Sequence, residues 1–159
     1  KYREGFRPFA PSVLEEDYNN FFEGNTTSPY MMLVKKIKEK IKLKTPTGYW
    51  NLNYWDRLYT NRSKLQSITH VDFSARIQTV SKKTNPKYWA LINEFKKLTE
   101  VGVLVNTSFN VRGEPIVNSP EDAFKCFMNT EMDYLVIENF IYEKKKQTIK
   151  YEKESFRLD

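Results

Sequence analysis

The chain has 159 residues, of which 40% are hydrophobic and 15% aromatic, so it can bury a core and is not intrinsically disordered. Its net charge of +6 and pI near 9.2 favour anionic partners such as nucleotides, phosphates, RNA or acidic membranes. A single cysteine and a single histidine exclude an intrachain disulfide and a closed zinc site built from nitrogen and sulfur ligands. No apolar run approaches the roughly 20 residues that span a bilayer.

The first segment, KYREGFRPFAPSVL, is basic and extended. Lys1, Arg3 and Arg7 fall on one side of an extended chain, and Pro8 and Pro11 exclude a helix. Three cations on one edge can form a phosphate clamp, because guanidinium groups match phosphate oxygens in pairs. The alternative is a solvated basic terminus.

A short helix is predicted from Glu15 to Phe22 and a strand from Tyr30 to Lys36. The following stretch, Lys42 to Leu65, is rich in Trp and Tyr and has no clean periodicity, apart from a short helix near Trp55 to Tyr59. Its aromatic residues either pack beneath a long loop, which we favour, or stack on nucleic-acid bases.

The segment ITHVDFSARIQTV, Ile68 to Val80, alternates as a strand does. If it is extended throughout, His70, Asp72 and Arg76 share one face and can bind a phosphorylated or carbonyl-bearing substrate. The alternative for His70 is a structural, hydrogen-bonded role. A Ser-His-Asp hydrolase is compatible with the composition, but no nucleophile-elbow sequence supports it.

The clearest helix runs from Thr84 to Glu100, with Asn85 as N-cap and Pro86 at the first helical position. Its apolar residues recur at helical spacing and are predicted to be core. They are Trp89, Leu91, Ile92, Phe95 and Leu98.

The leading site candidate follows this helix. Val103 to Val105 predicts a buried strand, which leads into a polar loop. The polar loop contains Asn106, Thr107, Ser108, Asn110, Arg112 and Gly113. Polar loops at the carboxyl ends of buried strands are where open α/β folds bind ligands.

The rest of the chain predicts a helix from Pro120 to Asn129, a strand from Tyr134 to Ile137, and a weakly alternating stretch from Phe140 to Phe156. Lys144 to Lys146 is expected at a hairpin tip. Helices alternate with strands, which predicts an α/β fold with a mixed sheet. We expect one domain over residues 1–159, a fragment of a longer protein, with a possible insertion at 38–65.

Three segments in order resemble one family: Arg3 to Leu14, His70 to Val80, and Val105 to Ala123 (VNTSFNVRGEPIVNSPEDA). They look like the C-terminal domain of O-carbamoyltransferases of the NodU/CmcH/TobZ type. That domain has a YrdC-like fold, a twisted mixed sheet flanked by helices. The Lys-x-Arg … Ser-x-Asn signature of such domains is matched by Lys1-Tyr2-Arg3 and Ser108-Phe109-Asn110.

The resemblance implies an enzyme that uses carbamoyl phosphate and ATP, with Mg²⁺, to form carbamoyl adenylate. A preceding actin/hexokinase-like domain of the same polypeptide would then transfer the carbamoyl group to a hydroxyl acceptor, and a cytoplasmic location is expected. The residues carried over as catalytic are Lys1, Arg3, Ser108 and Asn110. Those carried over as substrate-binding are Arg7, His70, Asp72, Arg76, Asn106 and Thr107.

Phe73 departs from the family pattern, because a small residue, usually Gly, is expected at that position. The change is expected to reshape the pocket near His70 and Arg76. The alternative to the enzyme is a non-catalytic RNA-binding module of the same fold, favoured by the basic charge and the interleaved aromatic residues.

Overall fold

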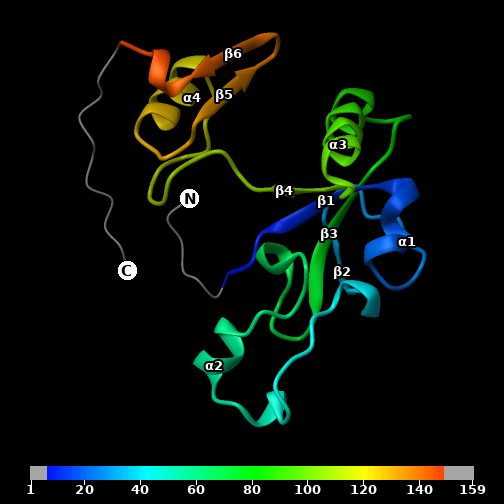
Figure 1. Cartoon of the computed structure of the whole chain (residues 1–159). Coiled ribbons are helices and arrows are strands. Elements are labelled where there is room, and N and C mark those ends of the chain that lie inside the picture. Colours follow the sequence, from blue (N-terminus) through cyan, green and yellow to red (C-terminus); the bar gives the residue numbers. More distant parts are fainter. Residues whose placement is uncertain (1–6, 149–159) are drawn as a thin grey trace. The chain divides into compact units, whose positions relative to one another are not determined.

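The computed structural model describes residues 7–148, which form two compact units, 7–107 and 108–148. Figure 1 shows the order of the elements along the chain. No helix within the described residues is both long and apolar enough to cross a membrane.

The larger unit is built on a four-stranded mixed sheet. Its strands are β1 (Ala10–Leu14), β2 (Leu33–Lys36), β3 (Ser74–Val80) and β4 (Val103–Asn106). They lie in the order β2-β3-β1-β4, with β1 parallel to β3 and the two outer pairs antiparallel. This arrangement confirms the predicted α/β class with a mixed sheet.

Short helices connect these strands. They are α1 (Tyr18–Phe21), α2 (Tyr54–Tyr59) and α3 (Pro86–Thr99), with 3₁₀ turns at Glu15–Asp17, Glu39–Ile41, Tyr49–Asn51 and Gln66–Ile68. The side chain of Asn85 accepts a hydrogen bond from the Tyr88 N–H at the start of α3, as its predicted N-cap role requires.

One face of the sheet carries the main core. Val13 of β1 and Ala75 and Ile77 of β3 are fully buried there. They pack with apolar residues from α1 and from the segments after β2, namely Tyr18, Phe22, Ile37, Ile41 and Ile68. Burial of these side chains is the main driving force for folding of this unit.

The other face is divided. Leu14, Val80 and Leu104 pack against Ile92 of α3, which covers that end of the sheet. Beyond α3 the same face carries polar residues, which we call the polar face: Ser12 of β1, Ser74, Arg76 and Gln78 of β3, and Asn106 of β4. One side of the sheet thus has two neighbouring regions, an apolar region under α3 and the polar face beyond it.

A partly buried ion pair joins α3 to the 3₁₀ turn that follows β1. The Lys96 ammonium lies 2.8 Å and 2.7 Å from the two carboxylate oxygens of Asp17, whose side chain is 8% exposed. Gly102 lies against this pair, since a Cβ added there would be 2.6 Å from Asp17 Oδ2. A glycine is needed at this position because the carboxylate occupies the space of a side chain.

The smaller unit packs one helix on one hairpin. Helix α4 (Pro120–Met128) starts with a capping box formed by Ser119 and Asp122. It buries Ala123 and Phe127 against the hairpin of β5 (Tyr134–Ile137) and β6 (Phe140–Glu143). The apolar residues Leu135, Ile137 and Tyr142 complete this core.

The predicted hairpin tip at Lys144 to Lys146 is wrong. The hairpin turns at Glu138 and Asn139, between the paired residues Ile137 and Phe140. The lysines form a 3₁₀ turn after β6, and the ammonium of Lys144 lies 4.8 Å from the ring centre of Phe127. The lysines therefore do form a turn, but it follows the hairpin and is held by a cation–π contact, while Glu138 with its left-handed backbone lies at the tip.

Two predictions of buried apolar residues are also wrong. Leu91, Phe95 and Leu98 are exposed on α3 (58%, 37% and 85%), because only one narrow stripe of that helix faces the sheet. Val105 is 47% exposed because the core that buries Val103 of the same strand does not extend to it.

The aromatic stretch differs from prediction in the same way. Tyr49 is buried, but Trp50, Trp55 and Tyr59 are exposed (60%, 60% and 76%), so most of its rings do not pack beneath a loop. The strand predicted from Tyr30 begins at Leu33.

The two sides of α3 give a direct stability test. Ile92→Ala should lower the free energy of unfolding by about 2–5 kcal/mol, because Ile92 is fully buried and its loss leaves a cavity. Leu98→Ala on the exposed side should change it by less than about 0.5 kcal/mol. Urea unfolding followed by circular dichroism measures both. Equal losses would contradict the packing of α3 described above.

Candidate functional site

His70 and Asp72 lie in a tight turn at the start of β3, where an extended strand was predicted. The His70 N–H donates to the Ser74 carbonyl at 2.8 Å, and the Phe73 N–H donates to the His70 carbonyl at 3.0 Å. The strand itself begins only at Ser74. The turn brings His70 and Asp72 together, and the strand alternation from which a shared face was predicted does not extend to them.

The hydroxyl of Ser74 links the two side chains. It donates to Asp72 Oδ1 at 2.6 Å and lies 3.0 Å from His70 Nδ1. Since its only proton is directed at the carboxylate, the imidazole must donate from Nδ1. This tautomer leaves Nε2 of His70 as the acceptor nitrogen of the ring.

The same geometry argues against a hydrolase triad. In such a triad the serine hydroxyl donates to histidine, which removes its proton. Here Ser74 donates to Asp72 instead, so its oxygen is not activated by His70. The composition-based hydrolase alternative gains no support from this geometry.

Charges around the turn fix the protonation of both groups. Burial lowers the pKa of His70; Asp72 opposes this effect, and the cations Arg76, Arg62 and Lys36 add to it. Burial alone would raise the pKa of Asp72, but hydrogen bonds from Ser74 and Lys36 hold it below its usual value. The Lys36 ammonium lies 2.9 Å from Asp72 Oδ2. Near neutral pH the site therefore holds a neutral imidazole beside a carboxylate and several cations.

The polar face continues from the turn across the sheet. Arg76 follows Ser74 on the same side of β3, and Gln78 follows Arg76. The side-chain oxygen of Gln78 accepts from Ser12 Oγ at 2.6 Å and from Asn106 Nδ2 at 2.7 Å. The predicted residues His70, Asp72, Arg76 and Asn106 are thus brought to one face of one unit.

Four members of this constellation were not predicted as site residues: Ser12, Lys36, Ser74 and Gln78. Ser74 and Gln78 share the parity of Asp72 and Arg76, which is a signal that the sequence does contain. Lys36 and Ser12 reach the site through strand register, with Lys36 opposite Ser74 and Ser12 opposite Gln78. No local pattern carries that information.

Phe73 closes the turn in a left-handed conformation, with φ of 61°. This conformation costs an L-residue about 1–2 kcal/mol, whereas glycine adopts it freely. The expectation of a small residue here has its physical reason in this backbone angle. In this chain the strain is offset by packing of the ring against its neighbours.

The second predicted cluster lies in the smaller unit. Ser108 Oγ donates to Asn110 Oδ1 at 2.7 Å, and the Asn110 amide donates to the carbonyls of Val111 and Glu114. Ser108 and Asn110 are therefore in direct contact, within a loop that the Asn110 side chain stabilises.

Two further predicted residues, Arg7 and Thr107, are exposed, near the first and last residues of the larger unit. Lys1 and Arg3 lie outside the described residues. Among residues 7–148 no three His, Cys, Asp or Glu side chains form a metal-binding group.

The charge of Arg76 should control the titration of His70. Arg76→Gln should raise the pKa of His70, because the change removes a cation that disfavours the imidazolium. The chain has one histidine, so an NMR titration of its ring reports the pKa directly. Lys87→Gln, on the exposed surface of α3, is the matched control and should leave the pKa unchanged. An unchanged value in Arg76→Gln would show that Arg76 does not face the imidazole.

The lowered pKa of His70 determines the direction in which the free energy of unfolding changes with pH. Between the usual pKa of about 6.5 and the lower folded value, the unfolded chain binds more protons than the folded chain. Acidification through this range should therefore destabilise the fold, and His70→Gln should remove that part of the pH dependence of urea unfolding. An identical pH profile in the variant would contradict the lowered pKa.

Comparison with known proteins supports one family. Residues 1–144 match the family model described as "Carbamoyltransferase C-terminus". The chain is 53% identical to an uncharacterized protein of Synechocystis over 100% of this chain and 26% of that protein. It is 43% identical to the nodulation protein NolO of Bradyrhizobium diazoefficiens, over 94% of this chain and 24% of that protein.

A third relative has a named activity. The 3'-hydroxymethylcephem-O-carbamoyltransferase of Amycolatopsis lactamdurans is 34% identical over 77% of this chain and 19% of that protein. The chain thus spans about a quarter or less of the length of these relatives. The family match covers both the turn that holds His70 and the Ser108–Asn110 loop. By this match and these identities, the chain belongs to the carbamoyltransferase C-terminus family.

Proposed function

We propose that the chain activates a carbamoyl group, by forming carbamoyl adenylate from carbamoyl phosphate and ATP. The observation that carries this proposal is the constellation on the larger unit, where His70 and Asp72 are fixed beside Lys36 and Arg76. Membership of the carbamoyltransferase family and the named activity of one relative support the choice of carbamoyl chemistry. A preceding domain of the longer polypeptide would transfer the group to a hydroxyl acceptor.

The proposed reaction has two steps. Water adds its oxygen to the carbamoyl carbon, the bond from that carbon to the bridging oxygen breaks, and the products are carbamate, inorganic phosphate and a proton. A carbamate oxygen then attacks the α-phosphorus of ATP, and the bond to the bridging oxygen of the β-phosphate breaks, releasing pyrophosphate. Both substrates are polyanions, so the protein must offset their mutual repulsion with fixed cations. Arg76 and Lys36 are described cations at the turn, and the buried Arg62 is a third.

His70 would orient the substrate. Its lowered pKa keeps the ring neutral near pH 7, and the Ser74 contact leaves Nε2 as an acceptor. A neutral acceptor at this position can receive a hydrogen bond from the carbamoyl NH₂ group. Asp72 holds this arrangement through Ser74 and is itself held by Lys36. The positions of the ring and of the carboxylate are therefore set by the turn before any substrate binds.

The other predicted residues keep their proposed roles. Lys1, Arg3 and Arg7 would bind phosphate oxygens. Ser108 and Asn110 would position the α-phosphate or the carbamate, and the backbone near Asn106 and Thr107 would contact the nucleotide. Mg²⁺ would enter with ATP, because this ion is commonly held by substrate phosphates together with water and one or two carboxylates.

The RNA-binding alternative has one observation in its favour, the exposed rings of Trp50, Trp55 and Tyr59. Bases stack on such rings, and lysines nearby would bind the backbone. That function predicts binding to single-stranded RNA that weakens steeply as salt increases. Saturable, nucleotide-specific binding of ATP together with weak RNA binding would exclude it.

Arg76 gives the test of the enzymatic proposal. In the full-length protein, pyrophosphate exchange into ATP should depend on carbamoyl phosphate, and Arg76→Ala should lower its rate about 100-fold or more, because a fixed charge is lost. Lys87→Ala is the matched control for removal of a surface cation. Exchange that does not require carbamoyl phosphate, or that survives in Arg76→Ala, would refute the proposal for this face.

A further inference from the structure

The outer side of the His70–Ser74 turn is in contact with the aromatic stretch that follows β2. The hydroxyl of Tyr49 donates to the Val71 carbonyl at 2.8 Å, and Val71 lies between His70 and Asp72 in the turn. Tyr49 is only 4% exposed. Its ring centre lies 5.4 Å from that of Phe73 in an edge-on arrangement. Tyr49 therefore contacts the turn twice, once through its hydroxyl and once through its ring.

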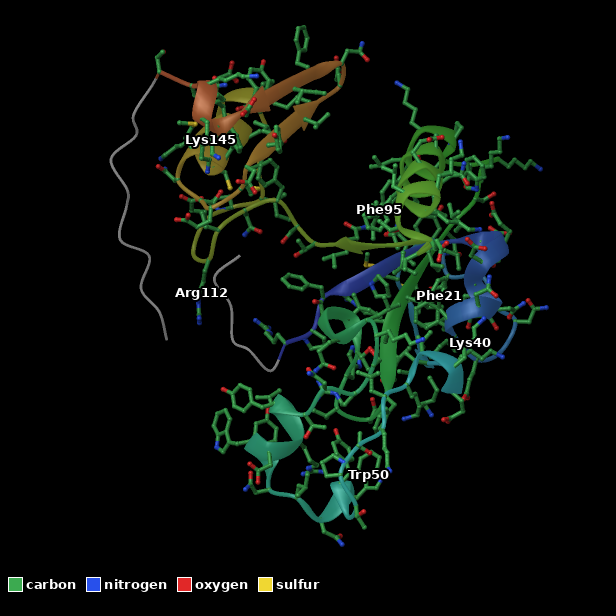
Figure 2. All side chains as sticks on the ribbon, in the orientation of Figure 1. Phe21, Lys40, Trp50, Phe95, Arg112 and Lys145 are labelled. Atoms are coloured by element: carbon green, nitrogen blue, oxygen red, sulfur yellow. The ribbon has the colours of Figure 1, made fainter. Side chains whose placement is uncertain are left out.

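Phe73 receives further contacts from the same stretch. The ring of Trp50 is 6.0 Å away, also edge-on, and the Lys42 ammonium lies 5.5 Å from the centre of the Phe73 ring. Such ring pairs and cation–π contacts are favourable beyond simple burial. Figure 2 labels Trp50 in the segment of the larger unit that also carries α2.

The backbone of Phe73 couples its ring to the site. Its N–H closes the turn on the His70 carbonyl, and its carbonyl accepts from the Ile37 N–H at 2.9 Å, directly after β2. Contacts that hold the ring in one rotamer therefore also favour the position of the backbone that closes the turn. The ring contacts thus support the turn that carries His70 and Asp72.

The stretch that supplies these contacts is itself fixed. The buried guanidinium of Arg62 donates to the carbonyls of Arg57, Leu58 and Thr60, and to the carbonyl of Thr69 at 3.3 Å. Thr69 immediately precedes His70. The aromatic stretch and the turn are thus joined on both sides of His70.

We propose that Tyr49 and Phe73 are positioning residues, which hold the His70–Ser74 turn from its outer side and so set the placement of His70 and Asp72. The aromatic stretch at Lys42–Leu65 then helps to build the site, although its rings contribute no group to the polar face. This inference rests on the proposed function only where activity is the readout. Displacement of a catalytic constellation by about 1 Å can cost on the order of 100-fold in rate.

Phe73→Gly separates positioning from stability. Glycine accepts the left-handed angle of 61° without strain, which offsets part of the free energy lost with the ring contacts. The variant is therefore expected to fold, while the outer contacts on the turn disappear. If Phe73 had only a structural role, its replacement would lower the melting temperature and leave the His70 titration unchanged.

The experiment uses the full-length protein with Phe73→Gly, and with Tyr49→Phe, which deletes only the hydroxyl bound to Val71. The first readout is an NMR titration of His70, and the second is carbamoyl-phosphate-dependent pyrophosphate exchange. Phe73→Gly should raise the pKa of His70 toward its usual value, because a loosened turn lets water reach the ring. It should also lower kcat/KM for exchange at least tenfold. Tyr49→Phe should shift both in the same direction by a smaller amount.

Tyr59→Phe is the matched control, because this tyrosine lies on the same stretch but is 76% exposed. Both readouts should match those of the unmodified protein. An unchanged His70 titration in Phe73→Gly and Tyr49→Phe would overturn the inference, as would an equal change in Tyr59→Phe. If the unmodified protein shows no exchange while the His70 titration shifts as expected, the proposed function fails and the positioning role stands.

Discussion

One side of strand β3 lies in the apolar core and the other side lies on the polar face. The architecture of the larger unit depends on keeping these two sides apart. Its alternation sends Ala75 and Ile77 into the apolar core and Arg76 and Gln78 to the polar face. A shift of one residue in register would exchange these sets, placing a guanidinium in the core. Pairing with β1 on one side and β2 on the other prevents that shift. The strand pairing that builds the core therefore also fixes the positions of the site residues on β3.

In the turn before β3, local hydrogen bonds fix the site residues. Ser74 is the first residue of the strand, yet its hydroxyl reaches back to Asp72 and His70. One side chain thereby sets a tautomer, orients a carboxylate and marks where the strand begins. The neighbouring cations then act on groups that are already fixed, which is the condition under which electrostatic stabilisation is most effective.

The elements with local signals could be predicted from the sequence. Asn85 and Pro86 mark the start of α3, Ser119 and Pro120 mark the start of α4, and the apolar runs mark β4 and β5. A shared face for His70, Asp72 and Arg76 was expected from their parity, but the turn before β3 is what brings His70 and Asp72 together. Helical spacing does not show which side of a helix meets the sheet. The prediction that Leu98 is a core residue is wrong for that reason.

The parts that could not be predicted depend on distant pairing. Ser12 meets Gln78, and Lys36 meets Asp72, only because three strands align in one register. The contacts that the Phe73 ring makes could not be predicted either. A departure from a small residue at one position indicates a constraint on the backbone, but the compensating contacts come from Tyr49 and Trp50, more than twenty positions earlier.

The separation of paired residues along the chain also bears on how the larger unit folds. Ser12 and Gln78 are 66 positions apart, and Asp17 and Lys96 are 79 positions apart. The entropy lost on closing such loops must be met before the contacts are formed, which slows the folding of sheets with distant strands. During synthesis β1 emerges before the other strands of the larger unit, and all five of its residues are buried in the folded protein. Tyr18 and Phe22 follow closely and can cover the face that carries Val13, whereas the face that carries Leu14 is covered by α3. That second face is therefore exposed until most of the larger unit has been synthesised.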